Sequence, residues 1–435
     1  MILGYLYSNY ILQALINSLN GFLKPGGKLF RGWWIVLSAS GIQMLAGVLW
    51  MQSFGAYVVL LQGEFGWSKA VIAGAFALTR VESGILGPLQ GWLTDRFGPR
   101  LILRIGTILF GIGFMLFSQI ETVLGFYLTF ALIAIGSSLG GFATLMVSIV
   151  NWFDKNRAKA VAFSQIGYSF GGLCVPVVVF SLELFGWRAT AFASGVIVIA
   201  VGLPLIQVIK HRPEDGEYPD GIAPDSSPIS ADKISPDQDL NARQAMKTSA
   251  FWFISIGHAL ALLTVSAVMV HLVTHLIEGL NYTLAQAALV VSLMTACQMI
   301  GQLLGGYLGD RFNKRFICVL CMLGHGSGML LVAWSTHPSM VIGFAVLNGL
   351  GWGTRGPLMV ALRADYFGSK SFGTIMGFSS LIAMLGMSIG PVITGYVADL
   401  QGNYVQSFTA IAAASVVGAL CFFFAKRPPS LNKVT

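Results

Sequence analysis

The sequence predicts an all-α membrane protein, with twelve transmembrane helices arranged as two pseudo-symmetric six-helix bundles. Three observations support this prediction. The 435 residues are 55% hydrophobic and only 10% charged, with a mean hydropathy of +0.74. Apolar runs of about twenty residues or more recur along the chain, which is typical of membrane-spanning helices. A motif of the first half returns in the second, so one half resembles a copy of the other.

The repeated motif lies where an apolar run ends in charged and turn-forming residues. Its first copy runs from Gly91 to Arg100 and its second from Gly306 to Arg315. Asp95 and Asp310 are equivalent and stand 215 residues apart, about half the chain. Six spans return a chain to the same side of the membrane, so the two halves are expected to run in parallel about an axis along the membrane normal.

The apolar runs also divide the chain. Residues 1–30 are expected to form an amphipathic N-terminal helix in the membrane interface. Residues 31–209 and 248–427 are the two bundles, 210–247 is a polar cytoplasmic linker expected to be largely disordered, and 428–435 is a cytoplasmic tail. The twelve expected spans are approximately 33–61, 68–94, 101–120, 122–150, 157–181, 188–209, 250–278, 283–309, 315–335, 338–366, 371–398 and 404–425.

The Lys and Arg residues predict the orientation. With the N-terminus in the cytoplasm, 22 of the 26 Lys and Arg fall in cytoplasmic segments, Arg363 among them. Lys69 and Arg188 fall outside, and Arg80 and Arg355 fall within spans. This asymmetry follows the positive-inside rule. We expect a multi-pass protein of the plasma (inner) membrane with both termini in the cytoplasm. The net charge of +8 is spread over short loops, so nucleic acid is not an expected partner.

Twelve spans, a long central loop and the doubled Gly-x-x-x-Asp-Arg motif resemble the major facilitator superfamily over essentially the whole chain. Within it, Gly32-Trp33-Trp34, Ser53-Phe54-Gly55 and Trp152-Phe153 resemble the monocarboxylate transporter and oxalate–formate antiporter group. That group's carboxylate carriers have an arginine in the eighth span, but residues 288–301 here contain no base. The resemblance therefore implies the fold of a carrier, but it does not identify the anion-binding residue in this sequence.

Arg80 and Arg355 are the candidates to replace that residue. A charge inside lipid costs roughly 2.5–3.5 kcal/mol or more, so such charges usually face a cavity or a partner. A guanidinium offers a planar fork of donors that matches a carboxylate. Arg355 is preferred, because the resemblance implies that the tenth span lines the central cavity. Asn348 and Trp352 are expected to share its helical face and the substrate pocket. The alternative is that each arginine is paired structurally, for example with Glu82.

Glu82 and His258 are the candidates for proton coupling. Glu82 is an acid in the middle of a span, where low dielectric favours the protonated form. His258 lies in the seventh span and could relay protons or bind substrate. A structural role is the alternative for each.

The doubled motif is expected to act as a gate. By the resemblance, the acid of each copy caps a neighbouring helix and joins ion pairs that hold the outward-facing state. The residues to which we assign this conformational role are Gly91, Asp95, Arg96, Gly306, Asp310 and Arg311.

One further pattern stands at the end of the seventh span. His271, His275 and Glu278 recur at positions i, i+4 and i+7, which places three metal-type ligands on one helical face. We expect a gate or interface role rather than a metal site, and we expect no cofactor.

Together these features predict a secondary active transporter and not an enzyme. Its expected partners are a small organic anion, a proton and the lipid bilayer, and it is expected to act as a monomer. The expected substrate is a monocarboxylate, moved by proton symport with alternating access. An anion exchanger, a carrier of another small solute, and a non-transporting sensor or scaffold are the alternatives.

Overall fold

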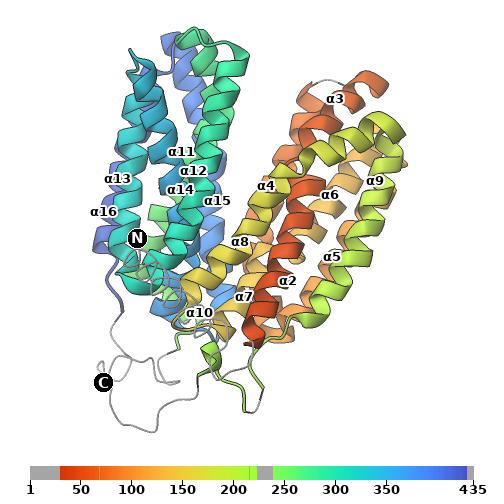
Figure 1. Cartoon of the computed structure of the whole chain (residues 1–435), viewed down its shortest axis with the longest axis vertical. Coiled ribbons are helices and arrows are strands. Elements are labelled where there is room, and N and C mark those ends of the chain that lie inside the picture. The colour runs from red at the N-terminus through yellow and green to blue at the C-terminus, as the bar shows by residue number, and fades with distance from the viewer. Residues whose placement is uncertain (1–29, 68, 215, 223–238, 429–435) are drawn as a thin grey trace, which may run out of the picture.

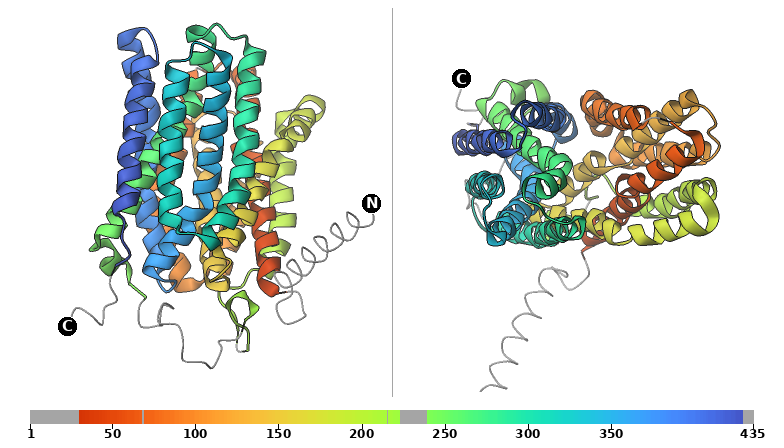
Figure 2. Two further views of the ribbon diagram at one scale, coloured as in Figure 1. Left: turned by 60° about the vertical axis from the view of Figure 1, so that its left-hand side comes forward. Right: turned by 90° about the horizontal axis from the view of Figure 1, so that it is seen from above.

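A computed structural model describes residues 30–67, 69–214, 216–222 and 239–428, and these residues are helical with short connections. The expected N-terminal amphipathic helix and most of the C-terminal tail lie outside the described residues. The chain folds into two helical bundles that stand side by side (Figures 1 and 2). This arrangement confirms the predicted fold class.

The first half contains eight α-helices and one π-helical segment among the described residues. Several begin or end at turn-forming residues, such as Thr122, which caps the N–H of Gly125. In order they are α2 (Arg31–Ala46), η1 (Gly47–Met51), α3 (Phe54–Phe65), α4 (Lys69–Phe97), α5 (Pro99–Phe117), α6 (Val123–Leu139), α7 (Phe142–Trp152), α8 (Arg157–Leu173) and α9 (Val175–Val208).

The linker and the second half follow the same principles. Thr248 and Thr283 cap their helices through side-chain oxygens. The described elements are η2 (Pro219–Gly221), α10 (Ala242–Met246), α11 (Ser249–Thr274), η4 (His275–Gly279), α12 (Leu284–Arg311), α13 (Lys314–Ala333), α14 (Pro338–Phe367), α15 (Phe372–Gln401) and α16 (Val405–Phe424).

The expected spans differ from the observed helices at several places. The first is interrupted by the π-helical η1, and the fourth is divided at Gly140 and Gly141. The fifth breaks at Cys174, and the turn before the sixth lies at Gly186, whose φ of 75° is accessible to glycine. Among the described residues, nine segments are long and apolar enough to cross a membrane, one of them containing both α8 and α9. The count of twelve remains a prediction.

The two halves meet near the linker and diverge at the opposite end (Figure 1). We call these the linker end and the open end. At the linker end, one apolar core joins Trp152 and Phe153 to Val360, Phe372 and Met376 of the second half. The cores nearer the open end each contain residues of one half, residues 48–198 in one and 267–412 in the other. The hydrophobic contact between the halves is therefore concentrated at the linker end.

Two linker aspartates bind equivalent loops of the two halves. The carboxylate of Asp220 accepts hydrogen bonds from the backbone N–H groups of Asp154, Lys155 and Asn156, at 2.6–3.2 Å. Asp239 accepts hydrogen bonds from Ser369 and Lys370, the equivalent residues of the second half, at 3.3 and 3.0 Å. The described ends of the expected disordered linker are thus fixed to the bundles.

Candidate transport pathway and gate

A hollow lies on the seam between the halves. Its volume is about 290 Å³, and it is lined by helices of the first half and by α15 of the second. Gly87 of α4 and Gly377 of α15 meet at this hollow, where a Cβ on Gly87 would lie 3.2 Å from the Gly377 carbonyl oxygen. We call it the seam pocket.

The polar groups of the seam pocket are amides and hydroxyls. Gln90 is buried, and its Nε2 donates to the backbone oxygen of Ser138 at 2.6 Å and to Thr144 Oγ1 at 3.0 Å. Ser138 Oγ donates in turn to Gln90 Oε1 at 3.1 Å. Gln43 donates to the backbone oxygen of Ser164 at 2.9 Å. These bonds fix the amides, and none of the described lining residues is charged.

The π-helical η1 shapes one wall of this pocket. It carries Trp50 and Met51, which both line the hollow. A π-helical turn inserts an extra residue and rotates the side chains that follow, and such turns are frequent at functional sites. On the neighbouring α8, Tyr168 also lines the pocket, and its backbone oxygen accepts a hydrogen bond from Gln52 at 2.7 Å.

Arg355 lies on α14 and is 1% exposed. Its Nε and Nη1 have no hydrogen-bond partner among the described residues. One turn earlier, a Cβ on Gly351 would lie 3.1 Å from the Cys321 oxygen and 3.4 Å from His325 Nε2. This face of α14 therefore turns toward α13, inside the second bundle, and Arg355 does not line the described seam pocket.

Asn348 accompanies Arg355 on that face. It is 1% exposed, and its Nδ2 has no partner among the described residues. His325 on α13 is fully buried, and neither of its ring nitrogens has a hydrogen-bond partner among the described residues. Trp352 is partly buried. The expected pocket residues of the tenth span thus share a helix, but the structure groups Arg355 and Asn348 with α13 rather than with the seam pocket.

Arg363, one of the bases expected on the cytoplasmic side, is 1% exposed within α14. Its guanidinium donates to Ser379 Oγ at 2.9 Å, to the Met359 oxygen at 2.9 Å and to His258 Nδ1 at 2.8 Å. Arginine can only donate, so His258 accepts at Nδ1 and carries its proton on Nε2. Burial of the charge is offset by these three bonds.

The remaining two expected site residues lie on α4. Glu82 is partly buried there. The side chain of Arg80 lies outside what the structure describes, although its position is helical. Arg80 precedes Gly87 by seven residues, so helical periodicity places both positions on one face of α4.

Asp95 and Asp310 each cap a helix of the other half. Asp95 accepts hydrogen bonds from the backbone N–H groups of Gly373 and Thr374, at 2.9 and 2.7 Å, in the first turn of α15. Asp310 accepts them from Ala158 and Lys159, at 2.8 and 3.1 Å, in the first turn of α8. Neither helix has a side-chain cap of its own, so these carboxylates satisfy N–H groups that a local cap would otherwise bind.

Gly91 and Gly306 allow these contacts. A Cβ on Gly91 would lie 2.0 Å from the Gly373 carbonyl oxygen, and one on Gly306 would lie 2.8 Å from the Ala162 Cβ. Any side chain at Gly91 would therefore force α4 and α15 apart.

Arg96 and Arg311 lie outside these caps. The Arg96 guanidinium lies 5.3 Å from the ring centre of Trp92, and Arg311 donates to the Tyr307 hydroxyl at 2.9 Å. Each contacts an aromatic residue one turn earlier on its own helix. Two ion pairs cross the seam here. Asp310 pairs with Lys159 of α8 at 3.9 Å, and Arg157 of α8 pairs with Asp365 of α14, which also pairs with Lys314 at 2.7 Å.

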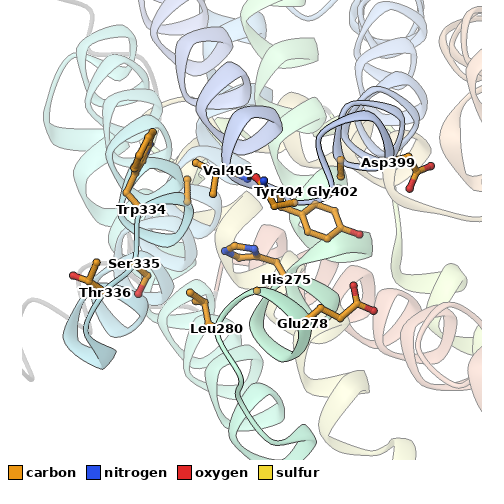
Figure 3. A pocket seen from close by; sticks show the side chains of 14 residues that line it. His275, Glu278, Leu280, Trp334, Ser335, Thr336, Asp399, Gly402, Tyr404 and Val405 are labelled. Atoms are coloured by element: carbon orange, nitrogen blue, oxygen red, sulfur yellow. Dashed lines mark hydrogen bonds between the residues drawn. The ribbon is translucent and has the colours of Figure 1, made fainter.

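His271 lies in the last turn of α11, and His275 and Glu278 lie in the following η4 (Figure 3). His271 Nε2 lies 2.9 Å from the Pro391 oxygen, and His275 Nε2 lies 3.0 Å from the Val332 oxygen. The described part of the chain holds no group of three His, Cys, Asp or Glu residues placed to bind a metal ion. Glu278 and His275 instead line a second hollow.

The seam pocket residues are not among those that the sequence predicts. Gln43, Gln90 and Ser138 are neutral, and neutral polar residues in spans are common enough to give little signal. Gln90 follows Gly87 by three residues on the same helix, and Gly87 packs against the other half. This spacing is the pattern that could have drawn attention to Gln90.

Two helical halves, a pocket on their seam and reciprocal caps at one end define a membrane carrier. Comparison with known families agrees: the profile of the Major Facilitator Superfamily matches residues 39–256 and 254–435. The chain belongs to this superfamily and is a transporter, not an enzyme.

Several curated proteins are similar over most of their length. Mouse (Mus musculus) "Monocarboxylate transporter 11" is 24% identical over 412 residues, which cover 92% of this chain and 89% of that protein. The "Probable hexose phosphate transport protein" of Chlamydia muridarum is 26% identical, covering 86% of each chain.

Solved structures share the fold. The fucose:proton symporter FucP of E. coli matches with a TM-score of 0.67 at 16% identity, covering 92% of this chain and 98% of that one. The human organic anion transporter MFSD10 matches with a TM-score of 0.64 at 16% identity, covering 90% and 97%. At this identity, the likeness concerns the fold.

Proposed function

We propose that this chain is a secondary active transporter of the plasma membrane that carries a small organic anion, a monocarboxylate, together with a proton. The observation that carries the proposal is the seam pocket, which lies between two halves joined at one end by reciprocal carboxylate caps. By the positive-inside rule the linker end faces the cytoplasm, so this conformation faces outward. Rocking of residues 31–209 against 248–427 would open the other side.

Two features favour an anion. The position of Arg80 shares a face of α4 with Gly87 of the seam pocket. Arg355 keeps Nε and Nη1 without partners among the described residues, so part of a buried guanidinium fork is available to a carboxylate once α14 moves. Similarity to mouse "Monocarboxylate transporter 11" supports the same class of substrate.

Proton coupling is assigned to Glu82 or His258. His258 accepts a hydrogen bond from Arg363 at Nδ1. A proton taken up at Nδ1 would remove this acceptor and place two cations together, so protonation would require Arg363 to move. Because His258 lies on α11 and Arg363 on α14, protonation of His258 would change the packing of these two helices.

A neutral hydroxylated solute is the second candidate. The uncharged amide and hydroxyl lining of the seam pocket favours it, since such groups bond sugar hydroxyls as well as carboxylates. This candidate would not need Arg80 or Arg355.

Uptake into proteoliposomes distinguishes the candidates. Wild-type protein, Arg80→Gln, Arg355→Gln and the control Arg104→Gln, a change on α5, would be tested with short monocarboxylates and neutral sugars under an imposed pH gradient. We expect saturable monocarboxylate uptake that falls in Arg80→Gln or Arg355→Gln and not in the control. Sugar uptake without acid uptake would favour the second candidate, and a requirement for internal anion would indicate exchange.

A further inference from the structure

The second bundle has another hollow, at the open end. Its volume is about 700 Å³, and it lies where η4, the end of α13 and the loop between α15 and α16 meet (Figure 3). None of its lining residues belongs to the seam pocket. We call it the end pocket.

The hydrogen bonds of two histidines determine which ring nitrogens are free. A carbonyl oxygen can only accept, so His271 Nε2 donates to Pro391 and His275 Nε2 donates to Val332. In each neutral ring, Nδ1 is then an acceptor. His271 Nδ1 lies 3.3 Å from the Tyr404 hydroxyl, which therefore donates to it.

His275 has no such donor. It lines the end pocket and is 2% exposed, and its Nδ1 has no hydrogen-bond partner among the described residues. It belongs to the π-helical η4, which also carries Glu278 into the pocket. A buried acceptor without a partner is unfavourable, so a ligand N–H that reached Nδ1 would be favoured.

The charges around the end pocket are negative. Glu278 and Asp399 both line it, and neither has an ion-pair partner among the described residues. The Tyr404 ring lies between His275 and Asp399 in Figure 3, with its centre 5.8 Å from that of the His275 ring.

We propose that the end pocket binds a small organic cation with N–H donors, of the polyamine class. Its ammonium groups would bond Glu278 and Asp399, and one N–H would reach His275 Nδ1. The ring of Tyr404 offers a face to the same cation. This site is independent of the proposed substrate, because it shares no residue with the seam pocket.

A metal ion fits these groups less well. Both nitrogens of His271 are already bonded, and one nitrogen of His275 is bonded to Val332. The described residues offer no set of three metal-type ligands. An ammonium ion needs acceptors at longer distances and no fixed coordination geometry, which suits carboxylates on separate elements.

Titration calorimetry of the purified full-length protein with spermidine tests the proposal. At low salt, where surface charges are least screened, we expect saturable binding. Glu278→Gln combined with Asp399→Asn should weaken it about tenfold or more, since both charge-assisted bonds are lost. Glu121→Gln removes an exposed carboxylate near the open end of the first half and should leave binding unchanged.

Two further measurements test the role of the N–H donors and of His275. Tetramethylammonium has charge but no N–H donor, so it should bind more weakly than spermidine, and His275→Phe should remove most of that difference. The double variant changes exposed side chains and should keep the wild-type melting temperature. The proposal is overturned by absence of saturable spermidine binding, by equal affinity for tetramethylammonium, by equal loss in Glu121→Gln, or by binding of Zn²⁺ in place of the amine.

Discussion

Asp95 and Asp310 make the same contact in opposite directions. Each lies near the end of a helix in its own half, and each accepts hydrogen bonds from the second and third residues of a helix in the other half. The capped helices, α15 and α8, lack side-chain caps from their own N-cap residues. Both helix starts therefore depend on the partner half for these bonds, and separation of the halves breaks them.

Asp95→Ala is expected to open the linker end. Loss of a helix cap costs about 0.5–2 kcal/mol, and the penalty falls only on the state in which the halves touch. A cost of one or two kcal/mol changes an equilibrium roughly five- to thirtyfold. Distances between spin labels on α5 and α13 at the linker end should lengthen. Asp310→Ala should act similarly, and an unchanged distribution in both would contradict the gate.

Gly91→Ala should disrupt the seam sterically. Its Cβ would lie 2.0 Å from the Gly373 carbonyl oxygen, so α4 and α15 must separate. Overpacking of this kind typically costs about 1–3 kcal/mol. The matched control is Gly63→Ala in α3, where a Cβ would meet nothing within 4 Å. We expect a lower melting temperature and less transport for Gly91→Ala only. Equal behaviour of the two variants would show that the contact is unimportant.

Gln90→Leu should impair binding in the seam pocket. The change removes bonds to Ser138 and Thr144, and leaves Ser138 Oγ without its acceptor. Unsatisfied groups cost about 1–3 kcal/mol, which corresponds to about tenfold or more in substrate affinity if the site is lost. Equilibrium binding of the transported acid measures this. Gln401→Leu, an exposed change at the end of α15, serves as the control.

His258 and Arg363 should be coupled in stability. His258→Phe removes the acceptor of the hydrogen bond from Arg363 Nη2. Arg363→Met removes the donor to Ser379 Oγ. Removing one partner of a buried charged group is costly, whereas replacing both by apolar residues is less so. The double variant should be destabilised by less than the sum of the single variants. Additive losses in melting temperature would show that the two residues act independently.

A pH-dependent contact joins α3 and α9 at the open end. The Trp187 indole N–H donates to Glu64, and Arg188 pairs with Glu64 at 2.9 Å. The Trp187 bond, and then Arg188, hold the pKa of Glu64 below its usual value. A depressed carboxyl pKa stabilises the fold above the unfolded pKa, and this stability is lost as pH falls through the folded pKa. The melting-temperature gap between wild type and Glu64→Gln should therefore shrink in that acidic window and stay constant near neutrality.

Much of the fold could be predicted from the sequence, because helices that span lipid require long apolar runs that are easy to recognise. Continuous apolar runs and the repeat of Asp95 at Asp310 were sufficient to predict two helical halves with related ends. The contacts of Asp95 with α15 and of Asp310 with α8 agree with the expected capping role. Their partners could not be read from the sequence, because contacts between helices distant in sequence depend on packing.

The candidate site was harder to predict, because the rotation of a helix about its axis is set by its neighbours. Asn348 and Arg355 do share a face, as the spacing indicates. That face turns toward α13, since glycines at 349 and 353 pack against α12 and Gly356 lies against Gln165 of α8. The π-helical η1 also leaves no simple sequence signal, although it shapes the seam pocket.

Proton movement with a carboxylate is the most direct measurement of the proposed function. Proteoliposomes containing a pH-sensitive dye would be exposed to increasing external monocarboxylate, with protein-free liposomes as the reference for passive diffusion of the acid. We predict internal acidification that saturates with substrate, exceeds the reference and is lost in Asp95→Ala combined with Asp310→Ala. Acidification that never exceeds the protein-free reference for any monocarboxylate would contradict proton-coupled transport of this class of substrate.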